Sequence, residues 1–360
     1  MSVPVEDRAR GRFGELDALR GIAACAVVAF HYTTLFDEFF PGHRRFPVTF
    51  RAGALGVQLF FMISGFVILM TARQKRSARA FGLARAVRLY PTYWACVTVT
   101  LLVTSATGVS VLGQPADVVA VNYTMLQSFL RVRDLDGAYW SLAREITFYL
   151  IVAAALVVMR GRLTSRVTTR IAVVWTLFGL ALCTLSWMRP GNVTHLLVSA
   201  TASQYAPLFS FGMVMYEMRL GQRRGLLLPA FLALAATATQ GLIEGWRLAP
   251  VVFLLTLAFA AVTLTNRFAW LNTRVLLWLG AVSYPLYLLH QNIGYAIIVR
   301  TDERLGPYGS RLIAFAVVLA LAWGVHEVIE RRLTRAISVR LRARPAPPHA
   351  PSAGGEPTNA

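Results

Sequence analysis

Long apolar segments recur along almost the whole chain and are separated by short polar segments. A helix needs about 20 mainly apolar residues to cross a bilayer, and about ten segments approach that length. They lie at roughly 16–36, 56–72, 91–110, 139–159, 171–188, 196–218, 225–243, 249–265, 275–298 and 311–329. This pattern predicts an all-α, polytopic transmembrane helix bundle of about ten spans. The second segment is short for a full span, which favours a tilted or partly re-entrant helix.

Composition and charge agree with a membrane protein and argue against a nucleic-acid-binding one. Hydrophobic residues make up 56% of the chain and charged residues only 15%, against about 25% charged in soluble domains. The net charge of +19 comes from short arginine clusters between the apolar segments, which is the pattern of the positive-inside rule. With a cytoplasmic N-terminus, most of the 36 Lys and Arg residues fall on the cytoplasmic side. We therefore expect both termini to be cytoplasmic and nucleic acid not to be a partner.

The chain reads as one membrane domain with short flanking segments. We expect a cytoplasmic N-terminal segment at 1–15, a membrane domain at 16–335 and a disordered cytoplasmic tail at 336–360, which is rich in Pro, Ala and Gly. The three cysteines lie in apolar segments without metal-ligand spacing, so no metal site and no disulfide framework is predicted. No phosphate-binding glycine loop, HExxH pair or GxSxG elbow is found.

Ionisable side chains inside apolar segments are costly and usually mark functional or paired groups. The first predicted span, "LDALRGIAACAVVAFHY", carries two of them, Arg20 and His31. Eleven positions of helical rise separate these residues by about 16 Å, so Arg20 is expected near the inner face and His31 toward the outer one. A histidine titrates near neutral pH and is suited to general-base catalysis. The alternative is a hydrogen-bonded packing histidine.

Polar residues also interrupt the second predicted span, "GALGVQLFFMISGFVI". Gly56, Ser64 and Gly65 permit close approach of neighbouring helices. Gln58 is a polar group in an apolar run and is expected to find a partner. Ordinary helix packing explains this stretch as well as a substrate site does.

The polar segment "RQKRSARAFGLARAVRLYPTYW" follows on the predicted inner side. Arg85 and Arg88 are three positions apart and share a face if the segment is helical. Two guanidinium groups on one face suit phosphate binding. The commoner role of such a run is topogenic charge and contact with lipid headgroups. Pro91 is expected to open the next span.

The stretch "YWSLAREITFYL" begins the fourth predicted span. Tyr139 and Trp140 suit a membrane interface, and Ser141 suits a helix cap. Glu145 is then an acid or a partner that orients a histidine, and is expected in the outer half of the span. The alternative is a carboxylate stabilised by the helix N-terminus.

A late stretch, "AVSYPLYLLHQN", combines aromatic hydroxyls with a histidine. Tyr284 and Tyr287 share a helix face, and His290 follows three positions later. Pro285 predicts a kink in this span. The alternative is a polar contact between helices of the bundle.

Taken together, these five stretches resemble the integral-membrane acyltransferase family 3 over about residues 13–335. The first resembles the family's "LDxLRxxA…H", and "GVQLFFMISGF" resembles "GVDxFFxxSGF". "RAVRLYPTYW" resembles an RxxR element followed by "xYPxYW", "YWSLAREITFYL" resembles "WSLxxExxFY", and "SYPLYLLH" resembles "SYxxYLxH". One departure is Gln58, where many members carry Asp, and we interpret it as the mark of a subgroup.

The resemblance implies roles for residues of this chain. His31 would be the catalytic histidine with Arg20 essential beside it, and Glu145 would occupy the family's acidic position. Arg85 and Arg88 would help to bind an acyl-CoA donor from the cytoplasmic side. No permanently bound cofactor is expected. The remaining substrate-site candidates are Gln58, Ser64, Tyr139, Trp140, Ser141, Tyr284 and His290.

The resulting hypothesis is a bacterial multi-pass plasma-membrane O-acyltransferase. It would move an acyl group, acetyl in the leading version, from acyl-CoA to a hydroxyl of a polysaccharide, glycolipid or glycosylated metabolite. Direct transfer and a covalent acyl-histidine both remain open. The alternatives are the same fold with another donor such as succinyl-CoA, a transporter or exporter of a small metabolite, and a structural membrane protein. No half-to-half repeat typical of transporters is found.

Overall fold

The computed structural model describes residues 13–109, 113–222, 225–334 and 336–337, and every regular element in these ranges is helical. The predicted disordered tail at 336–360 lies almost wholly outside the described residues. The longer helices are α2 (Gly14–Phe30), α4 (Gly56–Lys75), α5 (Ala78–Thr107), α7 (Trp140–Val158), α8 (Ser165–Met188), α10 (Ala206–Arg219), α11 (Leu227–Glu244), α12 (Ala249–Leu264) and α13 (Arg274–Val325). The short helices are α3 (Phe36–Phe39), α6 (Ala116–Asn122) and α9 (Asn192–Ala200).

The all-α membrane class is confirmed, whereas the predicted count of about ten spans is not. In the described ranges, 7 helical segments are long and apolar enough to cross a membrane. They are Gly14–Phe39, Arg51–Lys75, Ala78–Thr107, Gly137–Val158, Ser165–Met188, Leu227–Glu244 and Arg274–Thr334. The second predicted span is not short, because a 3-10 segment at Arg51–Leu55 extends it to 25 residues.

Two predicted boundaries are wrong for local reasons. Helix α5 begins at Ala78 and not at Pro91, because the Ser77 hydroxyl caps the amide of Ala80 and the following Ala and Arg residues favour a helix. Pro91 therefore lies inside the helix. The predicted span at 196–218 is broken near Ala202, whose φ is 50°, and the chain re-enters a helix at Ala206.

Helix α13 contains two predicted spans, 275–298 and 311–329, in one element. Its helical dihedral angles continue through Pro285 and break at Gly306, where φ is 67° and ψ is −179°. The expected kink at Pro285 is therefore not seen as a break in the dihedrals. Glycine tolerates the positive φ at Gly306 because it has no Cβ atom.

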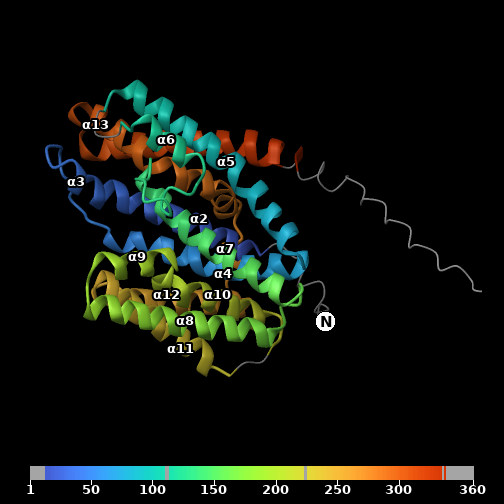
Figure 1. Cartoon of the computed structure of the whole chain (residues 1–360). Coiled ribbons are helices and arrows are strands. Elements are labelled where there is room, and N and C mark those ends of the chain that lie inside the picture. The colour runs from blue at the N-terminus through green and yellow to red at the C-terminus, as the bar shows by residue number, and fades with distance from the viewer. Residues whose placement is uncertain (1–12, 110–112, 223–224, 335, 338–360) are drawn as a thin grey trace, which may run out of the picture.

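Helix α4 lies at the centre of the bundle. Figure 1 shows α8, α10, α11 and α12 gathered on one side of it and α5, α6 and α13 on the other. A Cβ atom on Gly65 would meet the Phe209 carbonyl of α10, and one on Gly212 would meet the Met62 carbonyl of α4. These two glycines let the backbones of α4 and α10 touch, which confirms the packing role predicted for Gly65.

Candidate active site

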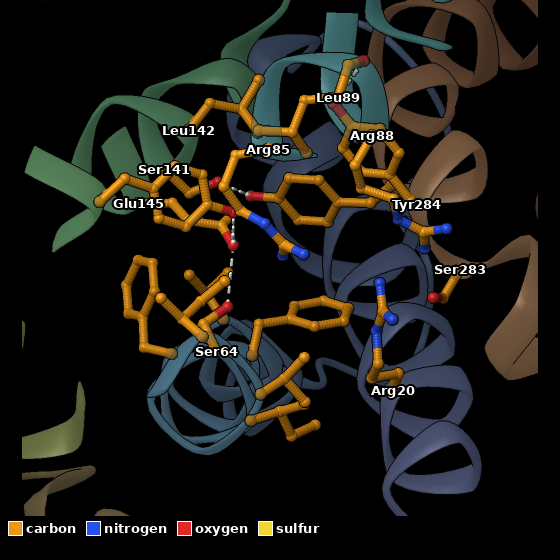
Figure 2. A pocket seen from close by; sticks show the side chains of 18 residues that line it. Arg20, Ser64, Arg85, Arg88, Leu89, Ser141, Leu142, Glu145, Ser283 and Tyr284 are labelled. Carbon is orange, nitrogen blue, oxygen red and sulfur yellow. Dashed lines mark hydrogen bonds between the residues drawn. The ribbon is translucent and has the colours of Figure 1, made fainter. Parts of the chain in front are cut away.

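A polar cavity with a volume of about 340 Å³ lies between α2, α4, α5, α7 and α13. We call it the arginine cavity, because Arg20, Arg85 and Arg88 line it. Figure 2 shows these side chains entering it from α2 and α5. Residues that are far apart in the sequence therefore meet at one site. The predicted residues Ser64, Ser141, Glu145 and Tyr284 line the same cavity.

The two arginines of α5 reach the cavity from neighbouring turns of one helix. Arg85 Nη2 donates a long hydrogen bond of 3.5 Å to Thr71 Oγ1, and Arg85 Nε is buried without a partner. Arg20 and Arg88 lie close enough to repel each other. The buried carboxylate of Glu330 attracts both. The cavity thus has spare donors and positive charge, which is what an anionic ligand needs.

Glu145 is the carboxylate inside the arginine cavity. Its Oε1 atom accepts hydrogen bonds from Ser64 Oγ at 2.9 Å and from Tyr149 OH at 2.6 Å (Figure 2). The same residue was predicted to lie in the outer half of its span, and the structure shows that its side chain lines the arginine cavity. Tyr149, one turn after Glu145, was missed by sequence reasoning although it stands in the same motif.

The start of α7 explains where Glu145 lies. The chain just before this helix is tied into the bundle, because Asp136 Oδ2 accepts a hydrogen bond of 2.9 Å from the amide of Asn292 in α13. Asn292 Nδ2 in turn donates to the Leu135 carbonyl at 2.8 Å. Helix α7 consequently begins inside the protein rather than at its surface. Burial raises the pKa of Asp136 to about 7.

Ser141 of α7 and Tyr287 of α13 together form one wall of the cavity. Ser141 was predicted to cap α7, but the helix begins at Trp140 and the Ser141 hydroxyl instead contacts Tyr287 OH at 2.8 Å. Tyr287 also donates to the Ala138 carbonyl at 3.0 Å. Tyr284 lines the cavity too, and its hydroxyl lies 3.4 Å from the Leu89 carbonyl. The predicted Tyr284 and Tyr287 pair therefore faces one site.

His31 and His290 form a buried pair behind Tyr287. Their ring centroids are 4.6 Å apart in an edge-to-face arrangement, and the ring of Tyr287 lies 5.7 Å from that of His290. Neither histidine lines the arginine cavity. His31 Nδ1 lies 2.8 Å from the Val27 carbonyl, and His290 Nδ1 lies 2.8 Å from the Tyr287 carbonyl.

These contacts set the tautomer of each histidine. A carbonyl oxygen only accepts, so each Nδ1 must carry the hydrogen and each Nε2 keeps its lone pair. His290 Nε2 is buried and has no partner. Each ring therefore keeps an unprotonated nitrogen on the side opposite its backbone contact, and the Gln291 side chain hydrogen-bonds His31. This is the form that a general base requires.

Arg311 holds the segment that contains His31, and sequence reasoning missed it. The chain changes from α-helix to π-helix at His31–Leu35. Short π-helical turns within α-helices are frequent at functional sites. Arg311 Nε donates to the Tyr32 carbonyl at 3.2 Å, while Tyr32 OH donates to the His290 carbonyl at 2.8 Å. Arg311 also pairs with Asp302 at 2.9 Å and with Asp37 at 3.1 Å.

Besides the two histidines, three predicted candidates lie outside the arginine cavity. Gln58 points to the other side of α4, where its Nε2 donates to Gln240 Oε1 at 3.1 Å. Tyr139 is fully buried against Tyr93, with ring centroids 5.2 Å apart, so it is not a membrane-interface residue. Trp140 lines a separate cavity described below.

No group of three His, Cys, Asp or Glu residues able to hold a metal ion is found in the part of the chain that the structure describes.

The chain belongs to a family of acyltransferases, because the family described as "Acyltransferase domain" matches residues 13–327. Acyltransferase MdmB of Streptomyces mycarofaciens is 25% identical over an alignment of 385 positions, which covers 93% of this chain and 95% of that protein. Nodulation protein 10 of Rhizobium leguminosarum bv. viciae is 28% identical over 175 residues, 44% of this chain and 48% of that protein. The chain thus spans about half the length of this second relative. No solved structure gives a significant match. The family predicted from the five motifs is confirmed.

Proposed function

We propose that the chain is a bacterial plasma-membrane O-acyltransferase with both termini in the cytoplasm. It moves an acyl group, acetyl in the first instance, from acyl-CoA to a hydroxyl of a carbohydrate or a glycosylated metabolite. One observation carries the proposal: three arginines line one cavity, and its Tyr287 wall touches the buried His290–His31 pair. An anion-binding site thus lies next to two rings that each present a basic nitrogen.

The arginine cavity is the binding site for the phosphate groups of the donor. Arg20 lies six helical positions from the start of α2, and Arg85 lies seven from the start of α5. Both are therefore about 10 Å from the same end of the bundle, which is the depth that phosphates entering from that end would reach. Phosphate oxygens accept from guanidinium groups in charge-assisted hydrogen bonds. Arg20, Arg85 and Arg88 all line the cavity and supply such donors.

His31 is the general base for the acceptor. The acceptor hydroxyl gives its proton to His31 Nε2 while its oxygen bonds to the thioester carbonyl carbon. The carbon–sulfur bond then breaks, and the CoA thiolate leaves and takes up the proton from the imidazolium. His290 lies 4.6 Å from His31 between ring centroids and positions that ring. Glu145 balances part of the arginine charge and, with Ser64 and Tyr149, keeps the cavity wall in place.

The experiment uses the full chain in lipid nanodiscs with radiolabelled acetyl-CoA. We expect release of CoA by the wild-type protein and transfer of label to added glycoside acceptors. His31→Ala should lower the rate about 10²- to 10⁴-fold, the usual contribution of a general base. His43→Ala is the matched control, because His43 lies in the loop after α3 and outside the histidine pair. A His31→Ala protein with the activity of the wild type would refute the assignment.

A further inference from the structure

A second cavity of about 340 Å³ lies on a neighbouring face of α7. It is open to the surface at His195 and Glu244 and is lined by α7, α9, the 3-10 segment Ser203–Tyr205 and the last turn of α11. Trp140 and Tyr205 give it an aromatic wall, with ring centroids 5.6 Å apart. Arg144, His195, Gln204 and Glu244 supply polar groups around that wall. A small organic ligand fits a cavity of this size and mixed lining.

Helix α7 separates the two cavities by its own periodicity. Trp140 and Arg144 are four positions apart and line the second cavity, whereas Ser141 and Glu145 line the arginine cavity. Residues four apart lie above one another on a helix, so α7 carries two parallel rows that face two sites. Arg144 also lies 5.9 Å from the Trp140 ring, so one row is held together by a cation–π contact.

A hydrogen-bond network fixes the carboxylate of Glu244 at this cavity. Glu244 Oε1 accepts from Tyr205 OH at 3.1 Å and from Gln204 Nε2, and its Oε2 accepts from Gln240 Nε2 at 2.7 Å. Gln204, Tyr205 and Gln240 are buried, with exposures of 8%, 5% and 3%. Glu244 itself is exposed, and the three buried donors fix the orientation of its carboxylate from the protein side.

The predicted candidate Gln58 belongs to this network. Its Nε2 donates to Gln240 Oε1, and Gln240 donates onward to Glu244. The polar chain runs from the first turn of α4 to the second cavity. Gln58 therefore supports a site other than the arginine cavity.

The charges of the two cavities differ. The arginine cavity has three arginines and one carboxylate in its lining, whereas the second cavity has one arginine, Arg144, and one carboxylate, Glu244. The first therefore suits an anion, and the second a neutral molecule with many hydrogen-bonding groups. A sugar ring combines hydroxyls at its rim with an apolar face that packs on aromatic rings. The pair Trp140 and Tyr205, beside Glu244 and Gln204, offers both kinds of contact.

We infer that the second cavity binds one neutral sugar ring of the acceptor, other than the ring that is acylated, stacked on Trp140 and Tyr205 and hydrogen-bonded by Glu244. This inference rests on the proposed function, since it names the acceptor of that reaction. A single phenyl ring connects the two sites: Phe61 lines the arginine cavity, and its centroid lies 4.7 Å from that of Tyr205 and 6.4 Å from that of Trp140. A sugar in the second cavity thus lies one phenyl ring away from the donor site, and the hydroxyl that is acylated belongs to another part of the acceptor, which extends past Phe61 toward His31.

The test measures binding and turnover with a panel of p-nitrophenyl glycosides as probes. In nanodiscs, at least one glycoside should raise the thermal midpoint of the wild-type protein, and Trp140→Ala and Glu244→Gln should abolish that shift. The variants should also raise the acceptor KM about tenfold or more while the rate of acetyl-CoA hydrolysis without acceptor stays the same. Glu303→Gln and Trp187→Ala are the matched controls, because both residues are exposed on helices away from the cavity.

Three results would overturn the inference. Either no glycoside raises the thermal midpoint of the wild type, or the glycosides raise the midpoints of the variants equally. The third is that Glu244→Gln raises the KM for acetyl-CoA and leaves the KM for the acceptor unchanged. The last would assign the second cavity to the donor. Failure of the proposed function is read separately, since it would appear as a wild-type protein that neither hydrolyses acetyl-CoA nor transfers its acetyl group.

Discussion

Arg85→Ala is the sharpest test of the arginine cavity. In the protein without donor, Arg85 makes a long hydrogen bond of 3.5 Å to Thr71 and a hydrogen bond with Tyr149, both neutral groups, and its Nε has no partner. Removing it should therefore change the stability of the protein little. In the complex, the loss of a hydrogen bond to a charged group costs about 1.5–3 kcal/mol. That free energy corresponds to a rise in the donor KM of about 10- to 150-fold.

The assay is the initial rate of CoA release against acetyl-CoA concentration, with the thermal midpoint measured in parallel. Arg85→Lys should fall between the wild type and Arg85→Ala, because lysine keeps the charge but loses the planar fork of donors. Arg79→Ala is the control on the same helix, with an exposed arginine outside the cavity. Equal effects of Arg79→Ala and Arg85→Ala would refute the reasoning and favour a general topogenic or lipid-binding role for this basic run.

Three further predictions concern the site and the bundle. Glu145→Gln should lower kcat while shifting the thermal midpoint little, because Gln keeps an oxygen for Tyr149; Glu145→Ala should lower both, and an unchanged kcat in both would contradict a role for this carboxylate. Gly212→Leu should abolish recovery of monodisperse protein in size-exclusion chromatography, because any Cβ atom would meet the Met62 carbonyl; normal recovery would show that α4 and α10 need not touch. The pKa of Asp136 is raised to about 7, so between pH ~4 and ~7 the folded state binds more protons than the unfolded state and the contribution of Asp136 to stability falls as pH rises. The thermal midpoint of Asp136→Asn should then depend less on pH over this window than that of the wild type.

The helical class was predictable because the lipid environment requires it. Lipid offers no hydrogen bonds to the backbone, so each apolar segment must satisfy its own amides as a helix. Helix ends were less predictable. The start of α5 depends on a cap at Ser77, and the break near Ala202 depends on one residue in the left-handed region, neither of which changes the apolar pattern.

The grouping of Arg20, Arg85, Ser64 and Glu145 was predictable only through the resemblance to a family. Hydropathy placed Glu145 in the outer half of its span but could not show which residues its side chain faces. The start of its helix is held by Asp136, which ties the preceding segment to α13 through the amide of Asn292. Such a contact joins residues 156 positions apart, and no local pattern reports it.

By itself, the sequence determined that this protein lies in a lipid bilayer and which types of residue form its polar site. Apolar segments with rare ionisable groups suit a bilayer, because each buried charge there is costly and is kept for a purpose. Only the tertiary structure decided which groups meet. It joined three arginines in one cavity, set His31 beside His290, and turned Gln58 away toward Glu244. The physical reason is that the face a helix presents to each neighbour depends on its rotation and depth in the bundle, and packing contacts such as Gly65 on Phe209 set both.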